Sequence, residues 1–254
     1  MIKTWFVGAM ASLLLVSSGI ADAAEIKFLC PVAMRAVMAD LVPQFERATS
    51  HKVTIDYATV GVITDRIVKG DAADVVIVSV KQADELLKGG KIIAGSRADI
   101  ARVGFGMFVR QGAPKPDIRS VDGLKRSLLA AKSIAYGDPA GGGPSGIHMA
   151  GLIERLGIAA AVKAKTKLVP PGARGLETVA KGDAEIGFGV MSDAVAVAGI
   201  DLVGPLPGEV QGYIEYVGGI LTSSKQTDAG KALISFLSSP AGKSILKAKG
   251  FEPR

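Results

Sequence analysis

The sequence predicts an α/β protein of two lobes, each an open, doubly wound sheet flanked by helices. Strand-like and helix-like segments alternate along the chain with short connections, which is typical of such sheets. The segment Asp74 to Val78 continues as an unbroken apolar run, as expected of a strand buried on both faces. Glycine-marked stretches at 104–108 and 204–208 separate two series of elements and predict two crossings between the lobes.

The first series is read from apolar periodicity, for example Val37, Leu41 and Phe45 on one helical face. We expect strands at 25–30, 52–58, 74–78 and 101–110, helices at 33–48, 63–69 and 81–88, and a turn at 59–61. In a doubly wound sheet the ligand crevice lies at the carboxyl ends of the strands. The loops at 31–35 and 59–62 and the turn around Ser79 are therefore candidate binding loops.

The second series begins after a loop at 111–117. We expect helices at 120–130, 144–156, 173–181 and 192–197, strands at 133–136, 166–169 and 185–188, then an extended run at 213–221 and helices at 229–237 and 242–249. In the helix at 144–156, Ile147, Leu152, Ile153 and Leu156 form the expected buried stripe. Lobe I is predicted to comprise 24–107 and 207–254, and lobe II 108–206, with a hinge that allows closure around a ligand.

The composition is that of a globular protein, with 48% hydrophobic and 21% charged residues. The net charge of +6 suits an anionic ligand, but the charges are scattered and form no basic run, so we expect no nucleic acid partner. The only cysteine, Cys30, excludes an internal disulfide and is expected to be a small buried hydrophobe. Two histidines without close ligand spacing predict no metal site.

The N-terminus resembles an export signal at residues 1–23. Lys3 is the positive region, an apolar stretch follows from Trp5 to Val16, and Ala21, Asp22 and Ala23 form an A-x-A cleavage site. The apolar stretch is too short for a stable membrane span. We therefore expect a mature, periplasmic protein that begins near Ala24.

A glycine-rich loop before the helix at 144–156 is the strongest local signal for a ligand. Such a loop directs several backbone N–H groups, together with the positive end of a helix dipole, at one point, which attracts an anion. The match to G-x-G-x-x-G at 141–146 is weak evidence for a dinucleotide, because no acidic residue stands about 20 positions on. Ser145 and His148 share a helical face, but the sequence fixes no third catalytic group, so His148 is read as a surface or interface residue.

Several segments resemble the periplasmic solute-binding proteins of ABC importers, and in particular the molybdate-binding family. They are Phe28 to Met34, Gly70 to Asp74 with the apolar run that follows, Asp138-Pro139 with 144–147, and 179–187 leading to Ser192-Asp193-Ala194. The resemblance implies a type II periplasmic-binding-protein fold, in which two lobes close like a Venus flytrap. It also implies an ABC permease in the inner membrane as partner. We expect a monomer without a cofactor.

The chain departs from that family where the resemblance places the ligand. Molybdate binders use serine hydroxyls in the first two loops, where this chain has Ala33 and Val60 or Gly61, and a tyrosine where this chain has Val190. An organic carboxylate is therefore as good a candidate as a molybdate-like oxyanion. The expected ligand-binding residues are Ala33, Met34, Arg35, Thr59, Val60, Gly61, Ser145, Gly146, Ala173, Arg174 and Val190. The alternative is an isomerase of an unsaturated tricarboxylate that resembles aconitate isomerase and uses the same cleft, with His148 or Ser145 assisting.

Overall fold

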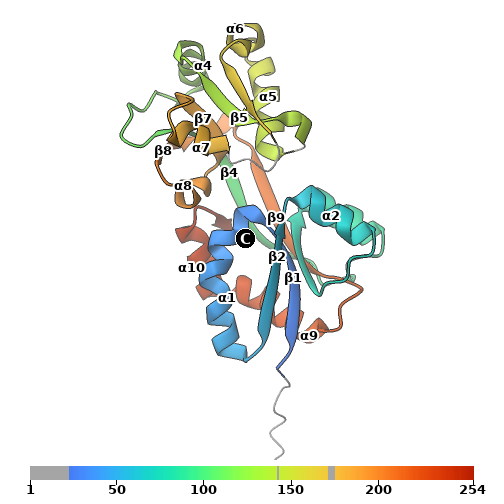
Figure 1. The fold of residues 1–254 in the computed structure, drawn as a ribbon. Coiled ribbons are helices and arrows are strands. Elements are labelled where there is room, and N and C mark those ends of the chain that lie inside the picture. Colours follow the sequence, from blue (N-terminus) through green and yellow to red (C-terminus); the bar gives the residue numbers. More distant parts are fainter. Residues whose placement is uncertain (1–22, 142, 171–174) are drawn as a thin grey trace, which may run out of the picture.

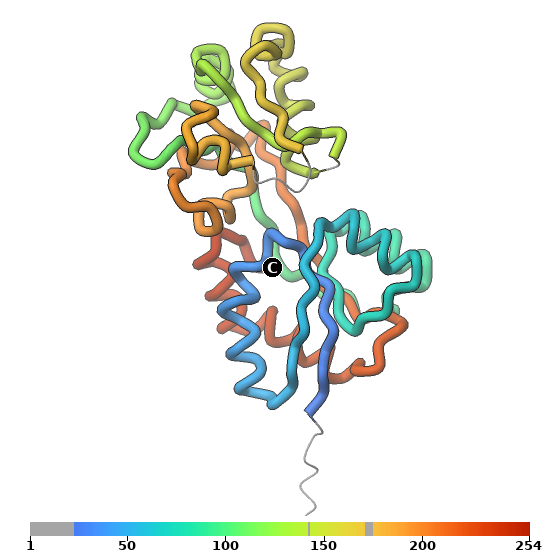
Figure 2. Tube along the Cα trace, viewed as in Figure 1, coloured from blue at the N-terminus to red at the C-terminus, as the bar shows by residue number. Residues whose placement is uncertain are grey.

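A computed structural model describes residues 23–141, 143–170 and 175–254, and these form two lobes connected by long strands (Figure 1, Figure 2). The predicted export signal, apart from residue 23, lies outside the described residues, and so do Ala173 and Arg174 of the predicted site. Within the described ranges, no helix is both long enough and apolar enough to cross a membrane.

Lobe I contains a sheet in the strand order β2-β1-β3-β9, followed by the first half of β4. The first three strands in this order are parallel, and β9 is antiparallel to both neighbours. The strands are β1 (Glu25–Pro31), β2 (Lys52–Ala58), β3 (Val75–Ser79), β4 (Ala98–Arg110), β9 (Tyr213–Ile220) and the short β10 (Glu252–Pro253) beside β4. The helices are η1 (Val32–Met34), α1 (Arg35–Thr49), α2 (Val60–Val68), α3 (Val80–Lys88), α9 (Thr227–Leu237) and α10 (Pro240–Ala248).

Lobe II continues the sheet from the second half of β4 through β7, β5 and β6, with β8 also paired to β4. Its other strands are β5 (Ile134–Gly137), β6 (Thr166–Val169), β7 (Ile186–Val190) and β8 (Ile200–Pro205). Its helices are α4 (Val121–Ala130), η2 (Pro139–Gly141), α5 (Pro144–Arg155), α6 (Ala159–Lys163), α7 (Gly175–Ala180) and α8 (Asp193–Ala196), and η3 (Gly208–Val210) lies on the return crossing.

The predicted two-lobe α/β class is confirmed, with one refinement. The two sheets share β4, so hydrogen-bonded pairing runs without a break from β2 to β6. The division of the chain at 107/108 and 206/207 stays a prediction. On the return path Leu206 N–H donates to Phe105 O, and the pairing of β9 with β4 begins at Tyr213.

Helices cover both faces of the lobe I sheet because the buried strands alternate their side chains. Phe28 and Cys30 of β1 pack on one face, against α1, α9 and α10, while Leu29 packs on the other face against α2 and α3. The expectation that Cys30 is a buried hydrophobe is confirmed, since its side chain is fully buried and unpaired. Burial raises the pKa of its thiol well above the ordinary value, so it stays protonated.

The buried stripe of α5 differs from the predicted one. Gly146, Met149, Leu152 and Ile153 face the lobe II core, whereas Ile147 is 53% exposed. These residues are spaced by three, three and one positions, which places them on one face of the helix, and position 147 lies outside that face. This isoleucine faces a pocket between the lobes instead.

Most predicted elements are present within a few residues of their expected bounds, but the start of α2 is earlier than predicted. Residues Val60 and Gly61, expected in a turn, form its first turn, with Thr59 as the capping residue. Strand β8 and helix α6 were not predicted. The prediction of a helix at 173–181 is met by α7 from Gly175 onward.

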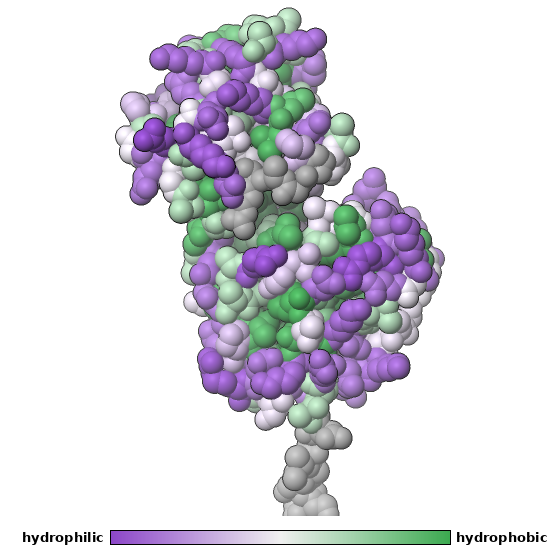
Figure 3. Space-filling model, viewed as in Figure 1, coloured by the Kyte–Doolittle hydropathy of each residue, from purple (hydrophilic) through white to green (hydrophobic). Residues whose placement is uncertain are grey.

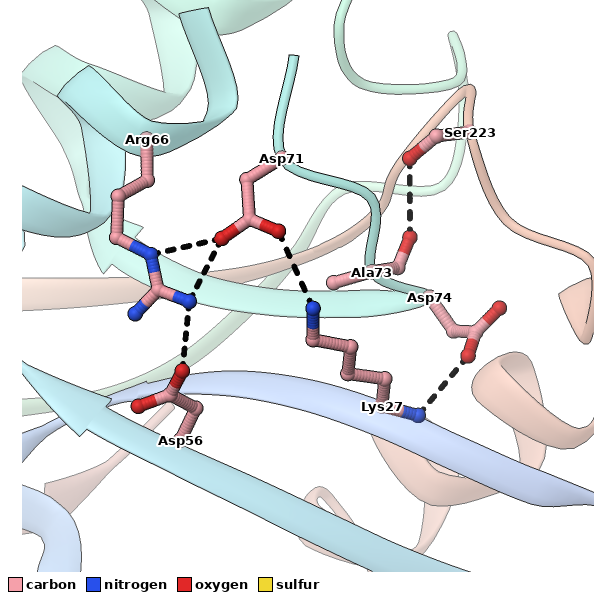
Figure 4. A network of polar contacts seen from close by, with 7 residues as sticks. All are labelled: Lys27, Asp56, Arg66, Asp71, Ala73, Asp74 and Ser223. Carbon is pink, nitrogen blue, oxygen red and sulfur yellow. Dashed lines mark hydrogen bonds and ion pairs between the residues drawn. The ribbon is translucent and has the colours of Figure 1, made fainter. Parts of the chain in front are cut away.

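A polar network fixes the base of lobe I (Figure 4). The Arg66 guanidinium binds the carboxylates of Asp56 and Asp71, both at 2.6 Å, and Lys27 Nζ donates to Asp71 at 3.1 Å. These contacts connect β1, β2 and α2. The cations hold the pKa values of Asp56 and Asp71 below the ordinary value of 3.8, chiefly through the hydrogen bonds of Arg66.

The second carboxylate of the Gly70 to Asp74 motif is also structural. Asp74 is 92% buried, with an exposed fraction of 8%, and its two oxygens accept four hydrogen bonds. The donors are Lys27 N–H, Ser224 Oγ, Lys225 N–H and Gln226 N–H. The motif therefore holds β1, β3 and the turn before α9 together. Asp74 directly precedes β3, at the opposite end of this strand from the start of α3 (Figure 4).

We expect Asp71→Asn to lower stability at neutral pH more than in acid. The folded-state pKa of Asp71 lies below its unfolded value, so its contribution is present in full above about pH 4–5 and is lost as the pH falls through the depressed value. Urea unfolding at pH 7 and at pH 3 measures the difference between the variant and the wild type. That difference should shrink at pH 3. The matched control is Asp65→Asn, an exposed position on α2, the helix that precedes Asp71. An equal loss at both pH values would contradict the prediction.

Candidate functional site

The parallel strands of lobe I end level with one another, so the helices that follow them start at one edge of the sheet. Pro31 at the end of β1 pairs with Ala58 at the end of β2. Leu29 pairs with Val76 of β3, which places the end of β3 at the same edge. The starts of η1, α2 and α3 therefore lie side by side, as the sequence predicted for its three candidate loops.

The corresponding edge of lobe II faces this one. Gly137 of β5 pairs with Val169 of β6, and β7 runs antiparallel to β4 and ends at Val190, opposite Phe105. Strand β3 runs the other way and ends level with Tyr216, which lies opposite Ala101 of β4. At about 3.4 Å per residue, the two edges are roughly 14 Å apart along β4.

The first helix start combines backbone donors with a cation. Ala33 is half-buried and Met34 is fully buried in the lobe I core, so the Met34 side chain is unavailable and only its backbone could face a ligand. Arg35 is exposed, and its guanidinium lies 4.3 Å from the ring centre of Tyr57 on β2. Such stacking holds the planar cation in place. Partial burial raises the pKa of Tyr57 to about 12, so its phenol remains neutral.

The second helix start is open to solvent. The Thr59 side-chain oxygen accepts a hydrogen bond from Val62 N–H at 3.4 Å. The N–H groups of Val60 and Gly61 have no acceptor within the helix, because they belong to its first turn. Thr59 and Gly61 are exposed and Val60 is half-buried. A Cβ atom at Gly61 would meet nothing within 4 Å.

The start of α5 belongs to lobe II. Pro144 occupies the first helical position of α5 after Gly143, and no side chain caps this end. Ser145 is half-buried there. Gly146 is buried, and a Cβ atom on it would lie 2.1 Å from Gly137 O. Its role is thus the close approach of α5 to β5, and it could offer a ligand only its N–H group.

One further predicted residue, Val190, and one that was not predicted, Gln211, lie beside the crossings. Val190 is 7% exposed and packs in the core as part of β7, so its side chain brings no polar group to this region. The Gln211 side-chain oxygen accepts from Phe105 N–H at 3.2 Å and from Gly212 N–H at 3.1 Å. This residue was not predicted, and it ties the two crossings together.

A pocket of about 780 Å³ lies between the lobes next to these helix starts. We call it the hinge-side pocket. It is lined by residues 79–82 and 212–215 of lobe I, by Pro144, Ile147 and His148 of lobe II, and by Phe105 at the crossing. Figure 3 shows the surface hollowed between the lobes on the side of α2 and α5. The turn around Ser79 was a predicted candidate loop and His148 was named for the alternative enzyme, but the other residues of this pocket were not predicted to bind a ligand.

His148 is an interface residue, as the sequence indicated. Its Nε2 lies 2.9 Å from Val210 O, and its ring stacks on Phe105 at 4.7 Å between centres. Its Nδ1 lies only 2.6 Å from the position that a Cβ atom would take at Gly212, so this side of the ring packs against the return crossing. Burial lowers the pKa of His148, which keeps the ring neutral at pH 7.

The electrostatics of the lobe I edge favour an anion. No Asp or Glu occurs at 26–39 or at 57–64, which include the starts of η1 and α2. In lobe II the Asp138 carboxylate is near the start of α5, and its Oδ1 accepts from Ala140 N–H at 2.9 Å. Among the described residues, no three side chains of His, Cys, Asp or Glu are grouped so as to hold a metal ion.

A two-lobe α/β fold with helix starts from both lobes around one cleft is the architecture of a solute-binding protein. The chain belongs to the family of bacterial extracellular solute-binding proteins, whose family model matches residues 26–252.

Similar proteins include both binding proteins and an enzyme. The aconitate isomerase of a Pseudomonas species is 32% identical over 96% of this chain and 95% of its own length. The molybdate-binding protein ModA of Azotobacter vinelandii is 29% identical over 91% of each chain. The solved structure of an Azotobacter vinelandii periplasmic molybdate-binding protein superposes with a TM-score of 0.69, at 21% identity, over 89% of this chain and 98% of its own.

Two glycines at the helix starts should respond oppositely to the same substitution. Gly146→Ala would force a methyl group against a backbone oxygen and should lower the free energy of unfolding by about 3 kcal/mol. Gly61→Ala places its methyl group in open space within a helix, so stability should be unchanged or raised by up to about 1 kcal/mol. Urea unfolding of the two variants measures this. Equal losses would show that the start of α5 is not packed on β5.

Proposed function

We propose that this protein is the periplasmic substrate-binding component of an ABC importer and that it binds a small organic carboxylate between its lobes. The closed, loaded form would be presented to a permease in the inner membrane. The observation that carries the proposal is the set of helix starts at the facing sheet edges, with the exposed Arg35 beside them and no carboxylate at 26–39 or 57–64. Family membership supports the receptor role.

Backbone donors at these helix starts can supply the binding free energy. A micromolar ligand requires about 8 kcal/mol. Hydrogen bonds to a charged group contribute about 1.5–3 kcal/mol each, and a helix dipole adds roughly 0.3–1 kcal/mol. Four or five donors from the two lobes are therefore sufficient. One lobe alone has too few, which is why we expect closure to accompany binding.

Side chains at the cleft favour a carboxylate over a compact tetrahedral oxyanion. Ala33 and Gly61 bring no hydroxyl groups to the lobe I edge, and Val190 brings none from lobe II. The planar guanidinium of Arg35, by contrast, matches the two oxygens of a carboxylate. The relative named as a molybdate-binding protein supports anion binding in general.

A thermal-shift panel tests the proposal directly. Molybdate, sulfate, succinate, citrate and propane-1,2,3-tricarboxylate are each added to the mature protein. A ligand at 100 times its Kd stabilises the folded state by about 2.7 kcal/mol, which corresponds to an increase in Tm of about 5 to 10 °C for a chain of this size. We expect at least one carboxylate to produce it. A panel without any stabilising anion would refute the receptor function.

Arg35→Gln should weaken binding of the stabilising carboxylate at least tenfold, because the two parallel, charged N–H donors of the guanidinium are lost. The control is Arg47→Gln in the last turn of the same helix, far from its start. Isothermal titration of both variants against the wild type gives the comparison. Equal affinities for all three proteins would exclude Arg35 from the site.

A second function, isomerisation of an unsaturated tricarboxylate, is favoured by one observation. The relative named aconitate isomerase matches nearly the whole chain at 32% identity. The contacts of His148 with Val210 and Gly212 direct its ring into the crossing, so Ser145 is the better candidate among the two residues that the sequence suggested for proton transfer.

Incubation with cis- or trans-aconitate, followed by chromatographic separation of the isomers, tests the second function. Interconversion that depends on protein concentration and is lost in Ser145→Ala would establish the enzyme. Binding of aconitate without interconversion would assign the chain to the receptor class alone.

A further inference from the structure

The hinge-side pocket continues the binding edge toward the crossing. In the lobe I sheet β3 lies next to β1, so the start of α3 at Val80 is the next helix start along the edge from η1. In lobe II, Pro144 and Ile147 lie on either side of Ser145 on the first turn of α5. A ligand held at the predicted site would therefore lie at the mouth of this pocket.

The walls of the pocket are apolar over a large part of their area. Ile147 from lobe II and Val80 from lobe I line it, and Phe105 and His148 form a stacked pair between them. Ile147 is 53% exposed, although Met149, Leu152 and Ile153 of the same helix are buried. A compact inorganic anion has no apolar surface to bury against such walls, whereas a hydrocarbon chain gains binding free energy from that burial.

The pocket also holds one cation that can reach a ligand. Among the described residues that line it, Lys81 is the only lysine or arginine, and its side chain is 82% exposed. Its contact with Glu85, at 4.0 Å, is a long ion pair along the helix surface, which costs little to exchange. The carboxylate in the lining, that of Glu215, already binds the Arg254 guanidinium.

From these walls and this cation we infer that the hinge-side pocket receives the carbon chain and a distal carboxylate of an organic polycarboxylate. Ile147 and Val80 contact the chain, and Lys81 pairs with the distal carboxylate. The inference rests on the proposed function, because the first carboxylate is held at the helix starts beside Arg35. It narrows the ligand to acids with two or more carboxylates separated by methylene or methine carbons.

Isothermal titration with acetate, succinate, propane-1,2,3-tricarboxylate and molybdate tests the inference. The wild type should bind the tricarboxylate most tightly and molybdate at least tenfold more weakly. Lys81→Ala should weaken tricarboxylate binding about five- to tenfold, and Ile147→Asp should weaken it at least tenfold. Two controls match these changes outside the pocket. They are Lys88→Ala at the other end of α3, and Val195→Asp, whose wild-type side chain is 52% exposed on α8.

The outcomes separate the inference from the proposed function. If Arg35→Gln loses binding while Lys81→Ala and Ile147→Asp bind like the wild type, the receptor function stands and the inference is wrong. Tighter binding of molybdate than of any carboxylate also overturns the inference. Failure of every anion to bind the wild type would overturn both. Circular dichroism and the Tm without ligand confirm that each variant is folded, and Ile147→Leu should keep wild-type affinity.

Discussion

The arrangement of the cleft depends on a single strand. Because β4 pairs antiparallel with β9 in lobe I and antiparallel with β7 in lobe II, the parallel strands of the two lobes must run toward each other. Helix starts, with their unpaired N–H groups and positive dipole ends, then face one another across the short stretch from Ala101 to Phe105. The direction of the strands is thus sufficient to bring the helix starts of the two lobes together.

Close contacts at the crossings maintain this arrangement. Gly104 and Gly106 let the neighbouring segments approach closely: a Cβ atom at either would lie 2.9 Å from a side-chain atom of Gln211 or Leu202. Gln211 joins the two crossings by the hydrogen bond that its side-chain oxygen accepts from Phe105 N–H, and His148 joins α5 to the return crossing. Both contacts lie beside Phe105, where β4 passes from one lobe to the other.

Periodicity predicted the fold well because burial on both sheet faces leaves a clear apolar pattern in strands such as β3. It failed where packing, and not local pattern, decides. Ile147 fits an apolar stripe in sequence, but the close approach of Gly146 to β5 turns a different face of α5 inward. The early start of α2 follows from capping by Thr59. The sequence did not show this, because Thr59 to Gly61 resembles a turn. The motif from Gly70 to Asp74 looked diagnostic and is structural. Gln211 and Lys81 gave no local signal, because their roles depend on distant segments.

The helix starts by themselves do not select a ligand. Backbone N–H groups and dipoles attract any small anion of suitable size, and exchange of one amino acid for another leaves them in place. Discrimination must therefore come from side chains around the ring of donors. In this chain positions 33, 61 and 190 carry no hydroxyl group, a stacked guanidinium lies at the start of η1, and an apolar pocket with a lysine opens beside the start of α3. A fold that binds oxyanions can thus be adapted to a longer, carbon-based anion by altering a few side chains at helix starts, while the sheet and its crossings remain unchanged.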